Sequence, residues 1–211
     1  RLKLANKYID GIAQKVLKKG IKLILPEQND LRVKKAQNRL ISMGIDFVDV
    51  DEYDDPTFYI NHIKNKKFTN NWTDDMLETY VSVPLNKALI LVDLDYADCL
   101  VAGATIPSSD VIKSAIRIVG LEKQTQWISS CFFLMNPNGL SAYTYADCGV
   151  IPAPDINQLV SIAYNATMTH KMVAQEEPKV AFLSFSTNGS AEHYTVKKMQ
   201  DAASVFSNKY P

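Results

Sequence analysis

The feature that most constrains the fold is a regular alternation of helix and strand patterns, which begins near the N-terminus. Apolar residues at helical spacing predict a helix over residues 4–18, and the short apolar run Ile21–Leu25 predicts a strand. Asp30, a residue type that commonly caps helices, precedes a second amphipathic stretch, and the apolar run Phe47–Val50 follows. Helices that alternate with strands indicate an α/β fold with a largely parallel sheet.

The same kinds of pattern continue along the rest of the chain, with a less regular stretch in the middle. The run Ala88–Val92 looks like a strand by pattern, although short apolar runs do not separate strands from buried helices. A helix capped by Ser109 or Asp110 is expected to extend through Val119. The other expected elements are a polar helix or loop over 54–67, a helix over 73–80, a strand candidate at Leu100–Ala104, a buried strand at Ser129–Met135, a strand at Ala142–Tyr145, a helix over 155–171 capped by Asp155, a strand at Val180–Phe185 and a helix from about Ala191.

One shift in composition is typical of a domain boundary. Two prolines and a glycine interrupt the pattern between Asp147 and Pro154. We therefore expect a first α/β lobe over residues 1–147 and a second lobe over residues 148–211. Together, the alternation and this interruption predict two Rossmann-like three-layer α/β lobes with mostly parallel sheets and a cleft between them.

The charge balance argues against a nucleic-acid partner. Lys plus Arg and Asp plus Glu both number 23, whereas a nucleic-acid binder usually shows a basic excess. No apolar run is long enough to cross a bilayer, which argues against a membrane partner. Three widely spaced cysteines fit neither a disulfide framework nor a zinc site and indicate the reducing cytoplasm. The three histidines lie far apart without metal-binding spacing, so no metal is predicted.

The stretch Leu183–Ser190, LSFSTNGS, is the first candidate binding motif. A strand would there feed a loop of small hydroxyl residues and one glycine, which can aim backbone amides and hydroxyls at an anion. A tight turn before a capped helix explains the same residues equally well, so both interpretations stay open. The candidate phosphate-binding residues of this loop are Ser184, Ser186, Thr187, Gly189 and Ser190.

A second candidate motif, Ala102–Lys113, follows the same logic of strand, glycine, small polar residues and helix start. Its candidate phosphate-binding residues are Ser108, Ser109 and Lys113, because Lys113 lies about one turn into the helix and can reach a phosphate near the helix start. A solvated lysine is the alternative interpretation. Two such loops at the carboxyl ends of strands suggest a cleft for a phosphorylated ligand.

Five segments, taken together and in order, resemble one known family. They are Leu25-Pro26-Glu27 with Asp30 and Arg32, Ala97-Asp98 followed by Val101–Ala104, Ser129–Met135, Ala146–Cys148 followed by Pro152, and Leu183–Ser190. On these motifs the chain resembles the phosphate acetyltransferase / phosphate butyryltransferase family. The resemblance makes residues 85–95 a helix, and we prefer that assignment to the strand at Ala88–Val92.

The resemblance implies an acyltransferase that moves an acetyl group reversibly between acetyl phosphate and coenzyme A by direct thiol attack. Coenzyme A is then a substrate, no separate cofactor is expected, and the partners are acetyl phosphate, coenzyme A, phosphate and a second copy in a homodimer. Lys113 stands where the family often has an arginine, and a further basic contact to coenzyme A falls near the lysines at 64–67. The residues placed along the cleft are Gly103, Ser129, Ser130, Asp147, Cys148 and Pro152.

The resemblance implies that the family's C-terminal segment, with a serine–arginine pair and an aspartate that acts on the thiol, lies beyond Pro211, so that the second lobe over residues 148–211 is expected to be incomplete. No catalytic residue is therefore identifiable, and the 211-residue form alone is expected to be inactive or nearly so. The last helix would then partly expose four apolar residues and favour association: Val196, Met199, Ala203 and Phe206. The alternatives are a non-catalytic acyl-CoA-binding regulatory domain, a phosphate butyryltransferase and a structural, dimerising remnant.

Overall fold

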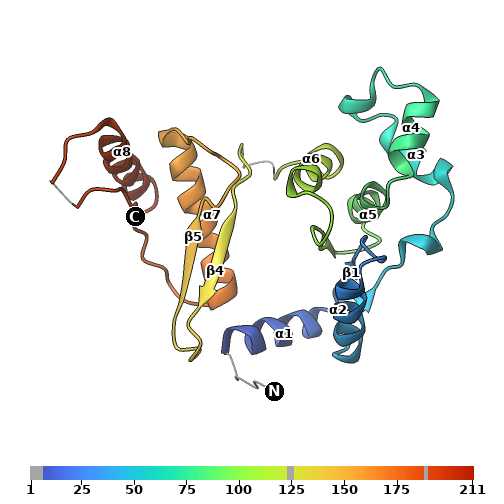
Figure 1. Cartoon of the computed structure of the whole chain (residues 1–211), viewed down its shortest axis with the longest axis horizontal. Coiled ribbons are helices and arrows are strands. Elements are labelled where there is room, and N and C mark those ends of the chain that lie inside the picture. The colour runs from blue at the N-terminus through green and yellow to red at the C-terminus, as the bar shows by residue number, and fades with distance from the viewer. Residues whose placement is uncertain (1–6, 123–125, 188–189) are drawn as a thin grey trace. The chain divides into compact units, whose positions relative to one another are not determined.

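Figure 1 shows a computed structural model of the chain, in which residues 7–122, 126–187 and 190–211 are described. Helices and strands alternate along the N-terminal half, as the sequence predicts. The elements are α1 (Lys7–Lys19), β1 (Lys22–Ile24), α2 (Leu31–Ser42), β2 (Asp46–Phe47), the 3-10 helix η1 (Val50–Glu52), α3 (Pro56–Ile63), the 3-10 helix η2 (Lys67–Thr69), α4 (Asp74–Val81), α5 (Pro84–Asp93), β3 (Cys99–Leu100), α6 (Ser108–Ile118), β4 (Cys131–Met135), β5 (Ala142–Ala146), α7 (Ile156–Ala174) and α8 (Tyr194–Lys209).

The chain divides into two compact units. The sheet unit comprises Ala13–Gly120, and the hairpin unit comprises Arg1–Ile12 together with Leu121–Pro211. The domain boundary predicted after Asp147 lies inside the hairpin unit, and that boundary stays a prediction. Within the described residues, no helix combines the length and the apolar character needed to cross a membrane.

The sheet unit is built on three parallel strands in the order β2-β1-β3. Leu23 of β1 pairs with Phe47 of β2 on one side and with Cys99 of β3 on the other. Leu23 and Ile24 are buried, as expected for a central strand covered on both faces. This arrangement confirms the predicted α/β fold with a parallel sheet.

Helix α5 forms the centre of the apolar core in the sheet unit. Most of its residues are buried, and helices α3, α4 and α6 pack against it. A helix that is apolar on nearly all sides reads locally like a strand, which explains why Ala88–Val92 resembles one by pattern. The family resemblance assigned a helix here, and the structure confirms it.

Two helices begin at the capping residues that the sequence predicts. The side chain of Asp30 accepts the N–H of Arg32, and Asp155 forms a capping box with Gln158. Helix α6 differs: Pro107 is its N-cap residue, and no side chain in the described part of the protein caps it. The prediction that Ser109 or Asp110 caps this helix is wrong, because both residues already lie inside its first turn.

The hairpin unit holds an antiparallel pair, β4 and β5, which packs against α7. Phe132 pairs with Tyr145 and Leu134 pairs with Tyr143, so these four side chains share one face of the hairpin. Their exposed fractions are 50–61%. The predicted strand at Ser129–Met135 is therefore present from Cys131, but the expectation that it is buried is wrong for this face.

Two further predictions in the hairpin unit are corrected. Val180–Phe185 is extended but pairs with no strand among the described residues. Helix α8 begins at Tyr194, with His193 as its N-cap residue, rather than at about Ala191. Of the four apolar residues expected to be partly exposed on this helix, two are buried against their neighbours in the unit: Val196 and Phe206.

Candidate functional site

The loop between β3 and α6 is folded around the carboxylate of Glu27. Oε2 of Glu27 accepts the N–H groups of Gly103 at 2.7 Å and Ala104 at 2.9 Å. Oε1 accepts the N–H of Ile106 at 2.8 Å, as well as the N–H and the hydroxyl of Thr105. Gly103 has φ +106°, a conformation that favours glycine, and this lets consecutive N–H groups turn toward one acceptor.

The pKa of Glu27 reflects these contacts. Its side chain is buried, with 8% of the residue exposed, and burial alone would raise the pKa. The N–H groups of the loop and the hydroxyl of Thr105 outweigh burial and lower the pKa to about 2. Glu27 is therefore a fixed internal anion near neutral pH.

The N-terminus of α6 directly follows this loop. Among the described residues, the N–H groups of Ser108 and Ser109 have no hydrogen-bond acceptor, and both residues are exposed. Lys113 is also exposed, one turn further along, and contacts no acidic partner in the described part of the chain. Free N–H groups at a helix start carry partial positive charge, so these three residues offer hydroxyls, amides and a cation to one anion.

A second internal carboxylate, that of Asp147, organises the start of β4 and the turn after β5. Its Oδ1 accepts the N–H and the hydroxyl of Ser130, each at 2.6 Å. Its Oδ2 accepts the N–H groups of Val150 at 2.9 Å and Ile151 at 2.6 Å. Burial would raise the pKa of Asp147, but these donors outweigh it and hold the pKa well below its usual range.

The other predicted cleft residues of the hairpin unit lie beside this carboxylate. The N–H of Cys148 donates to the hydroxyl oxygen of Ser130 at 3.0 Å, and its Sγ lies 3.1 Å from the carbonyl oxygen of Tyr145. The hydroxyl of Ser129 accepts a hydrogen bond from Asn165 of α7 at 3.3 Å. Pro152 is exposed in the same turn. The structure thus brings these predicted residues together at one end of the hairpin.

In the predicted hydroxyl loop, the described serine and threonine side chains hydrogen-bond to one another and to the backbone of the same loop. The hydroxyl of Ser186 lies 2.7 Å from that of Ser190, and the hydroxyl of Ser190 lies 2.7 Å from the carbonyl oxygen of Thr187. Ser184 bonds with the backbone of Ser186. Gly189 lies outside the described residues. These internal bonds match the tight-turn interpretation, and an anion-binding role of the loop stays a prediction.

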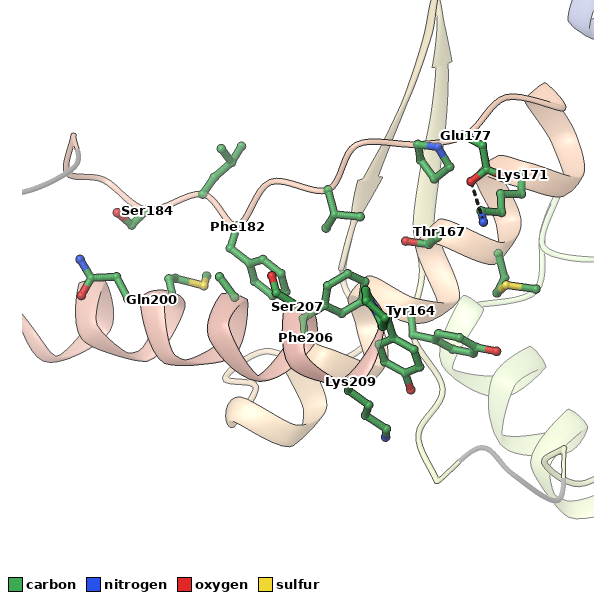
Figure 2. A pocket seen from close by; sticks show the side chains of 18 of the residues that line it. Tyr164, Thr167, Lys171, Glu177, Phe182, Ser184, Gln200, Phe206, Ser207 and Lys209 are labelled. Carbon is green, nitrogen blue, oxygen red and sulfur yellow. Dashed lines mark ion pairs between the residues drawn. The ribbon is translucent and has the colours of Figure 1, made fainter.

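A cavity of about 920 Å³ lies between α7, α8 and the extended segment 177–186. Figure 2 shows Phe182 on the extended segment facing Phe206 on α8, and their ring centres are 5.8 Å apart. Lys171 and Glu177 form an ion pair of 2.7 Å at another part of the wall, drawn as a dashed line. Ser184 also lines the cavity.

The lysine cluster expected to contact coenzyme A is partly engaged within the protein. Lys66 donates to the carboxylate of Asp93 at 2.5 Å and to the carbonyl oxygen of Ile118, the last residue of α6, at 2.6 Å. His62 lies 2.5 Å from the same carboxylate. Lys66 therefore stabilises the C-terminus of α6, while Lys64 and Lys67 remain exposed. Across the described residues, no three His, Cys, Asp or Glu side chains gather as a possible metal site.

The predicted site residues fall into two groups on different units. Gly103, Ser108, Ser109 and Lys113 belong to the sheet unit, and the remaining ones belong to the hairpin unit. A shared cleft stays a prediction. Glu27 stands in the sequence only as part of a motif, with no predicted role of its own. The sequence feature that could have pointed to a role for Glu27 is its spacing from Asp30 and Arg32 within one motif.

The fold and the loops together define an α/β protein in which internal carboxylates shape the loops that follow the strands. The sequence profile of the phosphate acetyl/butaryl transferase family matches residues 7–211. The chain belongs to this family, which confirms the resemblance seen in the motifs.

Individual relatives agree with the family assignment. A phosphate acetyltransferase of Paracoccus denitrificans is 32% identical over 202 residues, which cover 87% of this chain and 63% of that protein. A phosphate acetyltransferase of Thermoanaerobacterium thermosaccharolyticum is 31% identical over 231 residues, covering 96% of this chain and 70% of that protein. The chain thus spans 63% of the length of the Paracoccus relative.

Two solved structures share the fold. A phosphotransacetylase from Streptococcus pyogenes matches 97% of this chain and 70% of its own, with a TM-score of 0.85 and 24% identity. The EutD phosphotransacetylase from Staphylococcus aureus matches 98% of this chain and 69% of its own, with a TM-score of 0.78 and 23% identity. These likenesses extend over both units.

Proposed function

We propose that this chain is part of a phosphate acetyltransferase, which transfers an acetyl group reversibly between acetyl phosphate and coenzyme A in the cytoplasm. The thiolate sulfur of coenzyme A attacks the carbonyl carbon of acetyl phosphate, and a carbon–sulfur bond forms. The bond from that carbon to the phosphate oxygen then breaks, and phosphate leaves with the electron pair. The proton of the thiol passes to a base that we do not assign to any residue of this chain. No metal or cofactor is part of this proposal.

Membership of the family over residues 7–211 is the observation that carries this proposal. The geometry adds support at the N-terminus of α6. Two N–H groups without an acceptor among residues 7–122, 126–187 and 190–211, two serine hydroxyls and Lys113 suit a phosphate group of either substrate, because each oxygen of a phosphate can accept several such donors.

The family description covers both acetyl and butyryl transfer, so the acyl chain is a second variable of the test. The experiment measures thioester formation from coenzyme A with acetyl phosphate and with butyryl phosphate, and it measures coenzyme A binding by calorimetry. Faster turnover of acetyl phosphate by a form with the full length of the relatives would support the proposal. Faster turnover of butyryl phosphate would replace it by a phosphate butyryltransferase.

The 211-residue chain is assayed beside the longer form. Because the proposal assigns the general base to no residue of this chain, we expect it to bind coenzyme A and to turn over slowly or not at all; a missing general base costs a factor of about 100 to 10,000. Turnover comparable to that of the longer form would contradict this expectation. Binding of acyl-CoA without turnover by either form would favour a regulatory acyl-CoA-binding domain instead. Absence of any binding would reject the proposed function.

A further inference from the structure

The motif around Glu27 contacts the loop before α6 in two complementary ways. The carboxylate of Glu27 accepts the consecutive N–H groups of residues 103–106, which lie 76 to 79 positions further along the chain. Nη2 of Arg32 donates to the carbonyl oxygen of Ala104 at 2.9 Å. The segment 27–32 therefore binds both the donors and an acceptor of one loop.

Glu27 and Arg32, which hold the loop 103–106, are themselves held in place. The N–H of Asp30 donates to the carbonyl oxygen of Glu27 at 3.1 Å, which closes a turn before α2. The carboxylate of Asp30 caps α2 and forms two-point hydrogen bonds with the guanidinium of Arg32, the shortest at 2.7 Å. Such paired bonds fix the plane of a guanidinium. Arg32 can therefore present its other edge to Ala104 in a defined orientation.

The N–H groups around this loop form two sets, those bound by Glu27 and those at the start of α6. Because Glu27 already takes the N–H groups of residues 103–106, those groups do not face a ligand. Pro107 follows at once as the N-cap residue of α6. The position of the loop thus sets where the free N–H groups of Ser108 and Ser109 point, and the same rigid helix carries Lys113.

We propose that Glu27 and Arg32 are positioning residues, which fix the loop 103–106 so that the N-terminus of α6 is preorganised for a phosphate group of the substrate. This inference rests on the proposed function for its second half. Neither residue contacts the ligand in this proposal. Preorganised donors bind an anion without the cost of ordering a loop at the moment of binding.

The test compares hydrogen exchange of the amides of residues 103–106 with the affinity for coenzyme A. Glu27→Gln replaces one accepting oxygen by an amide group that itself donates, so the loop loses acceptors. We expect its exchange to accelerate by about tenfold or more and the affinity for coenzyme A to fall by about tenfold. Glu27→Asp keeps the charge on a shorter side chain and should restore part of both losses. Glu78→Gln, an exposed carboxylate on α4, is the matched control.

A second variant covers the case in which Glu27→Gln does not fold. The side chain of Arg32 is 72% exposed, so Arg32→Ala should fold and still accelerate exchange at Ala104 and its neighbours, with a few-fold loss of affinity. Arg39→Ala, on the last turn of the same helix, should change neither quantity. Unchanged exchange in the variants would show that Glu27 and Arg32 do not hold the loop 103–106. Faster exchange with unchanged affinity in folded variants would overturn the positioning role. If the unmodified protein binds no coenzyme A, the proposed function fails. The exchange comparison still decides whether Glu27 and Arg32 hold the loop.

Discussion

The hydroxyl of Ser130 donates to Oδ1 of Asp147 across 2.6 Å, and the same hydroxyl oxygen accepts the N–H of Cys148 at 3.0 Å. One serine therefore ties the residue before β4 to two consecutive residues after β5. The N–H of Ser130 donates to the same carboxylate oxygen, so the ends of the hairpin are held together by side chain and backbone alike.

Ser130→Ala should lower the free energy of unfolding by about 1–2 kcal/mol, because the N–H of Cys148 loses its acceptor and Asp147 loses one donor. Urea denaturation followed by circular dichroism measures the change. Ser204→Ala, at an exposed position of α8, should shift the free energy by less than about 0.5 kcal/mol. Equal effects of the two substitutions would contradict the prediction.

Two aspartates of the sheet unit should differ sharply in their contribution to stability. Asp93 is bonded to both His62 and Lys66 with its side chain 18% exposed, whereas Asp54 lies 3.5 Å from Lys87 and its side chain is 89% exposed. Asp93→Asn should cost about 2 kcal/mol, because Lys66 is left half-buried without its counter-ion. Asp54→Asn should cost less than about 0.5 kcal/mol. Thermal and urea unfolding of both variants measures the two costs. Similar costs for Asp93→Asn and Asp54→Asn would contradict the prediction.

Glu27 should make stability depend on pH in the acid range. Its pKa is lowered from 4.5 to about 2 in the folded protein, so the unfolded state binds more protons between these values. The contribution of Glu27 is therefore fully present above about pH 4.5 and is lost as the pH falls toward about 2. Urea unfolding between these limits should show a shallower pH dependence for Glu27→Gln than for the unmodified protein. Parallel curves would refute the assigned role of this carboxylate.

Lys113→Glu should weaken coenzyme A binding by about 1–3 kcal/mol, since an attractive charge near the free N-terminus of α6 becomes repulsive. Stability should change little because the side chain is exposed. Calorimetry with coenzyme A measures the affinity. Lys35→Glu, an exposed lysine on α2, controls for the change in net charge. Unchanged affinity in a folded Lys113→Glu variant would remove Lys113 from the site.

The exposed hairpin face should promote self-association. Phe132 and Leu134 pair with two tyrosines on this face, and neighbouring exposed apolar side chains favour association in water. We expect a homodimer by light scattering, and the double substitution Phe132→Thr with Leu134→Thr should shift it toward monomer while keeping strand propensity. Val101→Thr, an exposed apolar position of the sheet unit, is the control. A strictly monomeric unmodified chain would disprove the homodimer.

Several local features could be predicted from the sequence because their causes lie within a few residues. Asp30 and Asp155 cap their helices by bonding N–H groups two or three positions ahead, and Gly20 follows the end of α1 with φ +59°. The alternation of elements likewise predicted the parallel sheet. The order of the motifs identified the family. That resemblance also assigned α5 as a helix, where the apolar pattern fits both a helix and a strand.

The tertiary structure decided everything that depends on distant partners. An extended stretch such as Val180–Phe185 becomes a strand only when another strand lies beside it, and its own residues do not specify that neighbour. Burial of β4 likewise depends on what covers each face. The role of Glu27 was hidden for the same reason: its acceptor oxygens meet donors more than seventy positions away, and only the folded chain brings those N–H groups to one carboxylate.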